Sequence, residues 1–345
     1  MDGSLRRQIV IAFVALAFMP AIATGSGCNQ QRALPVMLTS AAPSPIDALP
    51  SWNDGAVKRS VVDFVDRVTN DGPDFVPFED RIAVFDNDGT LWQEKPLAEG
   101  AFTLARLERL TEADPSLRAE EPFKSALDAD VVRLHEQGAA AVLELAKKTH
   151  TGMTDKAYAA DVRQFLATAR HPRFGVPYTD LAYTPMLELL DLLRHRGFTT
   201  YVCSGGDTDF IRVFSTNVYG LPPERVIGSR FDKELVSIEG KTALLRTPKI
   251  ESINDKDEKP VGVDRRLGKR PIFAAGNVGT GGDIAMLRYT RDRNGPSFAL
   301  VIQHDDAERE AAYGEKDGAT LDAARRHGFS VVSMKRDWKV VFGRR

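Results

Sequence analysis

Two carboxylates stand two residues apart in the segment VFDNDGTLW, as Asp86 and Asp88. The short apolar run 81–85 that precedes them is typical of a buried strand, and Gly89 allows the chain to turn after them. Carboxyl groups that project together from a strand end repel each other unless a metal ion or a shared proton intervenes. The pattern therefore predicts a cation or acid–base site, with an ordinary Asx turn as the purely structural alternative.

Three further polar motifs are placed beside other strand-like runs. Ser204 and Gly205 follow the run FTTYVC, and a hydroxyl with backbone N–H groups at a helix start can hold phosphate oxygens; a plain helix cap is the alternative. Lys259 precedes the run PIFAA in a charged segment where a lysine is ordinarily solvated. Asn277 and Asp283 follow that run in the sequence GNVGTGGD. Whether these motifs form one site depends on the fold that positions them.

Short strand-like runs alternate with amphipathic helical segments along most of the chain. The runs are Arg81–Phe85, Phe198–Cys203, Pro271–Ala275, Ser297–Ile302 and Phe329–Met334. Helical patterns at 186–196 and 317–327 directly precede two of them. This alternation predicts an α/β fold, a Rossmann-like open parallel sheet with helices on both faces. The ligand site of such a sheet lies at the carboxyl ends of its strands.

One long segment interrupts the alternation. Residues 97–171, between the first and second strands, contain only helical patterns, including 100–109 and 154–169. We interpret this segment as a helical cap inserted after the first strand. The α/β core then comprises residues 51–96 and 172–345.

The first 27 residues are predicted to be a signal peptide. Arg6 and Arg7 precede an apolar run from Ile9 to Ala23. That run is shorter than the roughly 20 residues of a membrane-spanning helix. We therefore expect an exported protein.

Cys28 follows the apolar run behind small residues, as an acylated cysteine does in a bacterial lipoprotein. Cleavage after the A-x-A pattern at 21–23 is the alternative and would give a periplasmic or secreted protein. Residues 28–50, rich in Ala, Pro, Ser and Gln, are predicted to form a flexible tether. On the first interpretation a lipid anchor holds the protein at the cell membrane.

The composition excludes several other functions. The chain has 345 residues with 46 basic and 48 acidic side chains that are interspersed, so no basic face for a nucleic acid is indicated. Two cysteines exclude a disulfide framework, and six scattered histidines show no zinc-binding spacing. His304, in the sequence HDD after a strand, is expected to lie in a solvated loop, with a position that lines the site as the alternative. Nothing in the sequence indicates an oligomeric state.

In their order and placement at strand ends, the four motifs resemble those of the haloacid dehalogenase-like (HAD) hydrolase superfamily over about residues 81–290. The resemblance implies a Mg²⁺-dependent phosphomonoesterase that hydrolyses a small organic phosphate. Asp86 would attack phosphorus and form an aspartyl-phosphate, and Asp88 would act as general acid and base. The implied magnesium ligands are Asp86, the backbone carbonyl of Asp88, Asn277 and Asp283. The implied phosphate-binding residues are Thr90, Ser204, Gly205 and Lys259, with Lys256 and Lys269 as nearby alternatives for the lysine.

The chain departs from the family pattern at two places. In the fourth motif Asn277 stands where an Asp is common, and Asp283 comes six residues later rather than about four, so we expect weaker Mg²⁺ binding. The position of the insert and the Ser-Gly-Gly favour the phosphoserine-phosphatase-like branch. Gly89 and Lys95, however, stand where that branch has a serine and an acid, so phosphoserine is not the expected substrate.

Three alternatives to a phosphatase use the same fold. A phosphotransferase would use the same residues. A binding lipoprotein with a decayed site would explain the altered fourth motif, but it would not need Asp86, Asp88, Ser204 and Lys259 together. A dehalogenase would need neither the metal nor Asp88.

The lipid anchor predicts a defined effect of Cys28→Ala. The variant should leave the membrane fraction or remain unprocessed, because no thiol is present to be acylated. Fractionation and N-terminal sequencing of the mature protein measure both effects. A mature terminus at Thr24 would instead favour ordinary cleavage, and an intact Met1 terminus in the cytoplasm would contradict both routes.

Overall fold

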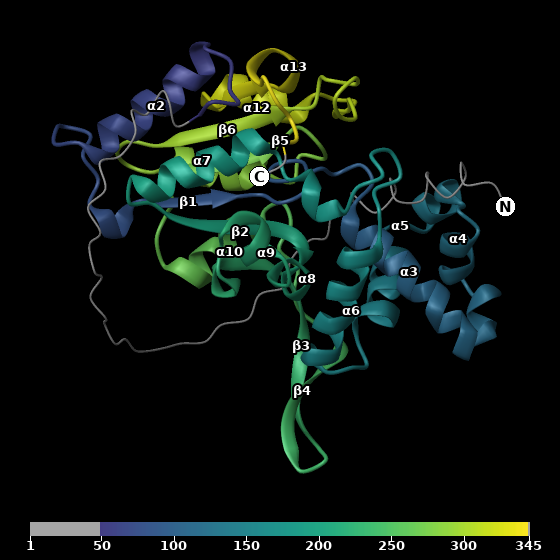
Figure 1. Ribbon diagram of the computed structural model, residues 1–345. Helices are drawn as coiled ribbons and strands as arrows, with labels where there is room; N and C mark the ends of the chain where they lie inside the picture. Colours follow the sequence, from purple (N-terminus) through teal and green to yellow (C-terminus); the bar gives the residue numbers. More distant parts are fainter. Residues whose placement is uncertain (1–48, 344–345) are drawn as a thin grey trace.

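The computed structural model describes residues 49–343, and the predicted signal peptide and most of the predicted tether lie outside them. A seven-stranded sheet in the order β4-β3-β2-β1-β5-β6-β7 forms its centre (Figure 1). The strands are β1 Ile82–Phe85, β2 Thr199–Asp207, β3 Val226–Ile238, β4 Lys241–Ser252, β5 Phe273–Asn277, β6 Phe298–Gln303 and β7 Ser330–Ser333. Neighbouring strands pair in parallel except β3 and β4, which are antiparallel.

Strand β1 is buried on both sides, as its continuous apolar sequence predicts. Ala83 and Phe85 belong to the apolar cluster on one face of the sheet, whereas Ile82 and Val84 belong to the cluster on the other. Phe85 pairs with Val202 of β2 on one side and with Ala275 of β5 on the other. The register brings the ends of these three strands to one edge.

Helices cover both faces of the sheet. One face packs against α2 Ala56–Thr69, α7 Thr184–His195, α8 Thr208–Arg212 and α9 Ser215–Tyr219. The other face packs against α10 Glu258–Leu267, α11 Ile284–Arg291 and α12 Ala319–His327. The other short helices of the core are η1 Phe78–Asp80, η3 Tyr178–Leu181, η4 Pro223–Arg225 and α13 Met334–Asp337. The predicted fold class, an α/β sheet covered on both faces, is confirmed.

The predicted cap, residues 97–171, is mainly helical, and its helices gather at one end of the sheet (Figure 1). These cap elements are α3 Ala98–Ala113, η2 Pro115–Arg118, α4 Phe123–Leu127, α5 Val131–His150 and α6 Asp155–Thr168. The cap has an apolar cluster of its own that includes Leu107 and Leu145. Phe102 of α3 and Tyr158 of α6, however, belong to the main core cluster. The cap is therefore packed onto the core rather than suspended over it.

The hairpin formed by β3 and β4 was not predicted. Many of its residues are polar and exposed, with only a few apolar residues between them. The hairpin therefore lacks the continuous apolar run that is typical of the parallel strands. Glu239 and Gly240 join the two strands, and both have positive φ. Two-residue turns with positive φ match the twist of paired strands and therefore favour hairpins. The hairpin projects away from the sheet, and β4 contacts both α5 and α6 (Figure 1).

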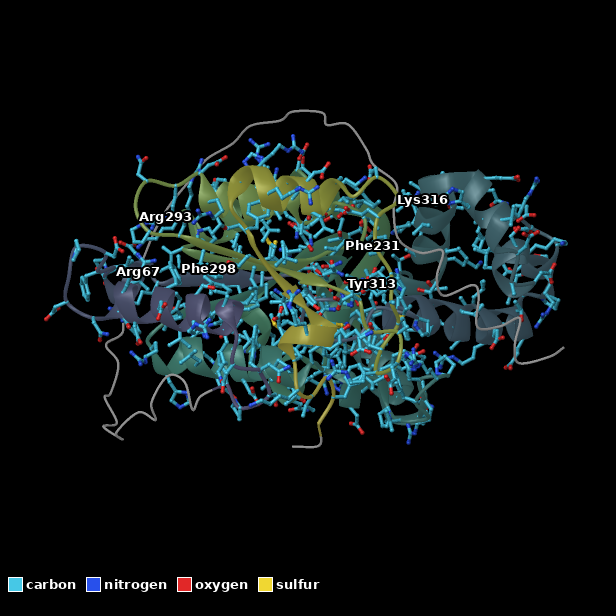
Figure 2. All side chains as sticks on the ribbon, turned by 90° about the horizontal axis from the view of Figure 1, so that it is seen from above. Arg67, Phe231, Arg293, Phe298, Tyr313 and Lys316 are labelled. Carbon is cyan, nitrogen blue, oxygen red and sulfur yellow. The ribbon has the colours of Figure 1, made fainter. Side chains whose placement is uncertain are left out.

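Figure 2 shows the molecule from above with all side chains. Phe231 of β3 and Tyr313 lie toward the cap, whereas Phe298 and Arg67 lie toward the opposite end of the sheet. No helix within residues 49–343 is long and apolar enough to span a membrane.

Candidate active site

The carboxyl edge of the sheet and the cap enclose a cavity of about 340 Å³, a size suited to a small ligand. The predicted site residues that line it are Asp86, Asp88, Ser204, Gly205, Lys259, Asn277 and Asp283. Thr90 is fully buried beside the cavity, and its hydroxyl donates to Asp86 Oδ2 at 3.3 Å. The structure thus brings the four motifs to one place, although they come from segments far apart in the sequence.

Lys259 lies at the centre of the site. It occupies the first turn of α10, and its Nζ donates to Asp86 Oδ1 at 2.6 Å and to Asp283 Oδ1 at 2.5 Å. All three side chains are buried. Burial alone would lower the pKa of Lys259, but the carboxylates of Asp283 and Asp86 raise it well above the usual value. The ammonium is therefore charged and holds the two carboxylates together.

Asp86 follows β1, and its backbone N–H donates to the carbonyl of Ala275 in β5 at 2.9 Å. Burial raises the pKa of Asp86 well above its usual value, and the charge of Asp283 raises it further, while Lys259 lowers it. The cluster of Asp86, Asp283 and Lys259 carries one more negative than positive charge when both acids are ionised. An additional cation is therefore favoured here.

Asp88 is held by an aromatic side chain. The indole Nε1 of Trp92 donates to Asp88 Oδ1 at 2.8 Å, and the Trp92 ring stacks on Phe214 at 4.3 Å between centroids. Burial raises the pKa of Asp88 to about 6 despite the hydrogen bonds from Trp92 and Asn87, which lower it. A carboxyl group with such a pKa can both give and take a proton near neutral pH.

The fourth motif reaches the site although its acid is displaced. The loop after β5 returns so that the backbone N–H of Asn277 donates to Asp283 Oδ2 at 2.9 Å. This close return requires Gly276, because a Cβ there would lie 2.6 Å from the Cβ of Asp283. The side-chain nitrogen of Asn277 is 3.3 Å from Glu94 Oε2 and 3.4 Å from His304 Nε2. Asp283 thus faces Lys259, whereas the amide of Asn277 faces a different set of polar groups.

The expectation that His304 lies in a solvated loop is wrong. His304 is buried, its Nε2 is 2.9 Å from the carbonyl of Gly89, and its Nδ1 is 3.3 Å from Glu310 Oε2. Its ring stacks on Tyr313 at 4.1 Å. The HDD sequence follows β6, whose end also lies at the carboxyl edge of the sheet, so the histidine supports the turn after Asp86 rather than facing solvent.

The Ser204 motif differs in local structure from the predicted helix start. Strand β2 continues to Asp207, and α8 after it has only five residues. The Ser204 hydroxyl accepts from the backbone N–H of Gly206 at 3.0 Å, and the N–H of Asp207 donates to Glu99 Oε2 at 3.1 Å. These two amides already have protein partners. Ser204 and the exposed Gly205 line the cavity from within β2.

The donors at the site suit magnesium. Within residues 49–343 no three His, Cys, Asp or Glu side chains form a group that could hold a metal ion. Two buried carboxyl groups, those of Asp86 and Asp283, nevertheless contact the same ammonium, and the three groups carry a net negative charge when both acids are ionised. Mg²⁺ binds through one or two carboxylates, together with carbonyl oxygens, water and substrate phosphate. The residues present therefore fit this ion.

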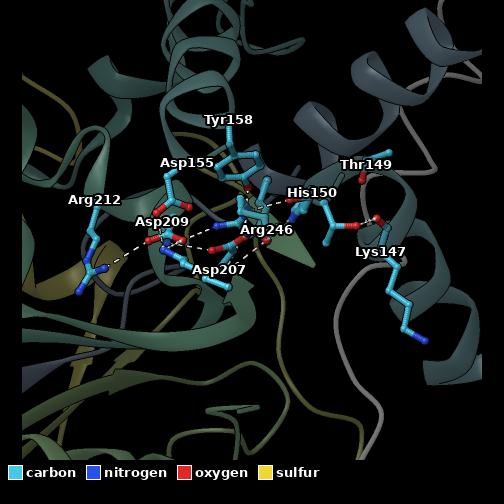
Figure 3. Close-up of polar contacts among 12 residues, drawn as sticks. Lys147, Thr149, His150, Asp155, Tyr158, Asp207, Asp209, Arg212 and Arg246 are labelled. Carbon is cyan, nitrogen blue, oxygen red and sulfur yellow. Dashed lines mark hydrogen bonds and ion pairs between the residues drawn. The ribbon is translucent and has the colours of Figure 1, made fainter. Parts of the chain in front are cut away.

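A second charged network joins the cap to the core (Figure 3). Arg246 of β4 is fully buried and pairs with Asp207 and Asp209, and its guanidinium lies 4.0 Å from the centroid of the Tyr158 ring. Arg246 Nε donates to the carbonyl of His150, the last residue of α5, at 2.7 Å. One side chain from the hairpin thus contacts β2, α6 and α5.

The pKa values in this network diverge. Burial raises the pKa of Asp207, but the hydrogen bond to His150 and the charge of Arg246 outweigh it and bring the pKa to about 2. Burial and the negative charge of Asp207 raise the pKa of Glu99 to about 8. Burial lowers the pKa of His150. At neutral pH an ionised Asp207 therefore lies between Arg246 and a protonated Glu99.

Sequence reasoning missed several residues that line the cavity. These are Glu94, Glu99, His150, Asp207 and Asp255. Asp207 directly follows the Ser-Gly-Gly, so its place at a strand end was a usable signal. Arg246 gave none, because its position depends on the hairpin that was not predicted.

Comparisons with known proteins identify the family and the fold. A model of the haloacid dehalogenase-like hydrolase family matches residues 83–276. A functionally unknown protein from Anaerococcus prevotii has a similar structure, with 15% identity, coverage of 85% of this chain and 94% of that chain, and a TM-score of 0.53. A phosphoserine phosphohydrolase-like protein from Francisella tularensis has 14% identity, 73% and 94% coverage, and a TM-score of 0.38. A comparison with curated protein sequences finds no match. At these identities the likeness concerns the fold alone.

Arg246→Met should destabilise the protein strongly. The change leaves Asp207 without its buried cation, while Asp209 keeps Lys233 and Arg212, and breaking a buried pair costs about 3–5 kcal/mol. Urea unfolding at pH 7 measures the loss.

Arg212→Met provides the matched control. Arg212 also pairs with Asp209, at 3.2 Å, but its side chain is 32% exposed. We expect the control to lose less than about 1 kcal/mol. Equal losses for the two variants would show that the buried network does not hold the cap to the core.

Proposed function

Because this chain belongs to the haloacid dehalogenase-like hydrolases, we propose that it is a Mg²⁺-dependent phosphomonoesterase that hydrolyses a small organic phosphate. The observation that carries the proposal is the shared Lys259, which places Asp86 and Asp283 in one buried cluster beside Asp88 at the cavity floor. A protein that only binds a ligand has no need to bury this cluster.

In the first half of the proposed reaction an oxygen of Asp86 attacks phosphorus and the bond to the leaving oxygen breaks. The leaving oxygen takes a proton from the carboxyl group of Asp88, and an aspartyl-phosphate remains on Asp86. The Trp92 indole orients Asp88 for this transfer.

In the second half a water molecule attacks the aspartyl-phosphate. Asp88, now ionised, accepts a proton from that water, the bond to Asp86 breaks, and inorganic phosphate leaves. Ser204 and the Lys259 ammonium, which both line the cavity, would donate to the phosphate oxygens in both halves. The cap excludes bulk water from the aspartyl-phosphate.

The residues that would hold Mg²⁺ are Asp86, Asp283 and the backbone carbonyl of Asp88. The ion would offset the repulsion between the anionic nucleophile and the anionic phosphate. Asn277, the fourth ligand that the resemblance implies, donates its backbone N–H to Asp283, while its side-chain nitrogen lies 3.3 Å from Glu94 Oε2.

We also propose that the enzyme is exported and held at the membrane through Cys28. The support is the order of the N-terminal segments in the sequence: an arginine pair, an apolar run, small residues and then the cysteine. The substrate would then be met outside the cytoplasm.

The two carboxyl groups should be separable by trapping the phosphoenzyme. With ³²P-labelled 4-nitrophenyl phosphate, Asp86→Asn should give no acid-stable labelled protein, because it lacks the nucleophile. Asp88→Asn should still be labelled, since nitrophenolate leaves without much protonation, while turnover falls about 10²- to 10⁴-fold. Label on the Asp86→Asn protein would contradict the assignment.

Removal of the metal tests the second part of the proposal. Treatment with EDTA should abolish turnover of 4-nitrophenyl phosphate, and Mg²⁺ should restore it. Asp283→Asn should raise the Mg²⁺ concentration needed for half-maximal activity by about tenfold or more. Asp292→Asn, which changes a half-exposed acid at the end of α11, serves as the control and should leave that concentration unchanged. Full activity of the EDTA-treated enzyme would exclude a metal requirement.

A further inference from the structure

We propose that the substrate of this site is the phosphate ester of a neutral, mainly apolar alcohol, and that a second anionic group on the alcohol is rejected. The inference rests on the proposed phosphomonoesterase activity and concerns the part of the cavity beyond the reacting phosphate.

The cap side of the cavity is mainly apolar, although Glu99 and Thr103 of α3 and His135 and His150 of α5 also line it. It is lined by Leu97, Leu134, Ala139, Val142, Leu143 and Ala146, all but the first from α5. Phe231, Ile250 and Ile253 line it from the base of the hairpin. Ala146 is the last of these apolar residues on α5 and lies about one helical turn before His150. The apolar lining of α5 therefore ends near the charged network of Arg246. A leaving group that fills this side of the cavity would therefore meet several aliphatic side chains and the Phe231 ring.

The charges around the cavity are unfavourable for a second anion. Seven acidic side chains line it, and four of these, Glu94, Glu99, Asp207 and Asp255, lie outside the catalytic cluster. Glu99, whose pKa is raised to about 8, is mainly a neutral carboxyl group at pH 7, and Asp207 pairs with Arg246. Among the described residues that line the cavity only Lys259 and Arg230 are permanent cations. Lys259 is shared by Asp86 and Asp283 at the phosphate end. Arg230 is exposed and pairs with Glu251 at 3.1 Å.

The histidines do not change this balance. Burial lowers the pKa of His150 and so favours its neutral form. His135 is exposed on α5. A carboxylate or second phosphate on the leaving group would lose water without gaining a buried cation, and such a transfer is strongly unfavourable. An apolar leaving group has no such cost and gains from leaving water.

Substrates with the same leaving oxygen test the inference directly. Benzyl phosphate and 4-carboxybenzyl phosphate differ by one distal carboxylate and have similar intrinsic reactivity. We expect kcat/KM for benzyl phosphate to exceed that for the carboxylated ester by about 100-fold or more. Equal values within about twofold would overturn the proposal. Preference for 4-(aminomethyl)benzyl phosphate over benzyl phosphate would also overturn it, because the acids would then select a cation.

A cation placed in the apolar lining should reverse the preference. Leu143→Lys should raise kcat/KM for 4-carboxybenzyl phosphate and lower it for benzyl phosphate. Val132→Lys adds the same charge to α5 at a position that is 71% exposed and does not line the cavity, so it should change neither value. Ala146→Lys repeats the test should Leu143→Lys fail to fold. The same response in the Leu143 and Val132 variants would show that α5 does not contact the leaving group.

Failure of this inference is distinguishable from failure of the proposed function. Absence of turnover with 4-nitrophenyl phosphate and all three benzyl esters, in the presence of Mg²⁺, would reject the phosphomonoesterase itself. Turnover of the benzyl esters without discrimination would keep the phosphomonoesterase and reject only the apolar subsite.

Discussion

The site depends on the two ion pairs that the Lys259 ammonium makes with Asp86 and Asp283. Asp86 and Asp283 come from segments that follow two neighbouring strands, and both carboxylates are buried. Two like charges cannot be buried as neighbours unless a cation lies between them or one takes up a proton. Strand order, the return of the loop after β5 and the start of α10 all serve to bring these three groups together. The rest of the cavity is arranged around them.

Much of the fold could be predicted because parallel strands are buried on both faces. Continuous apolar runs such as 82–85 therefore mark them, and the polar residues that follow mark the functional edge. This reasoning located Asp86 and Asn277 at strand ends, whereas Ser204 lies within β2, which continues to Asp207. It could not show that Asp283 turns back to the lysine, because loop conformation depends on contacts such as the Asn277 N–H. The hairpin was missed because half-exposed strands carry polar residues that resemble loops.

The cap and the core are joined by two kinds of contact at once. Apolar packing is supplied by Phe102 and Tyr158, which are part of the main core cluster. Charge pairing is supplied by Arg246, which orders the end of α5 through the carbonyl of His150. Apolar packing is non-directional and tolerates small shifts of a helix, whereas a buried ion pair does not. The Arg246 network therefore fixes the position of the α5 lining relative to the catalytic carboxylates.

The origin of Arg246 on β4 has an evolutionary consequence. The cap is one continuous insertion in the chain, and such segments look like cassettes that recombination could exchange between relatives. Here the positive charge that the cap interface requires is encoded some 80 residues beyond the end of α6, in a different structural unit. A transplanted cap that lacked its own hairpin would be placed against mismatched charges. Cap and hairpin are thus expected to be inherited together, and chimeras designed from this scaffold need both.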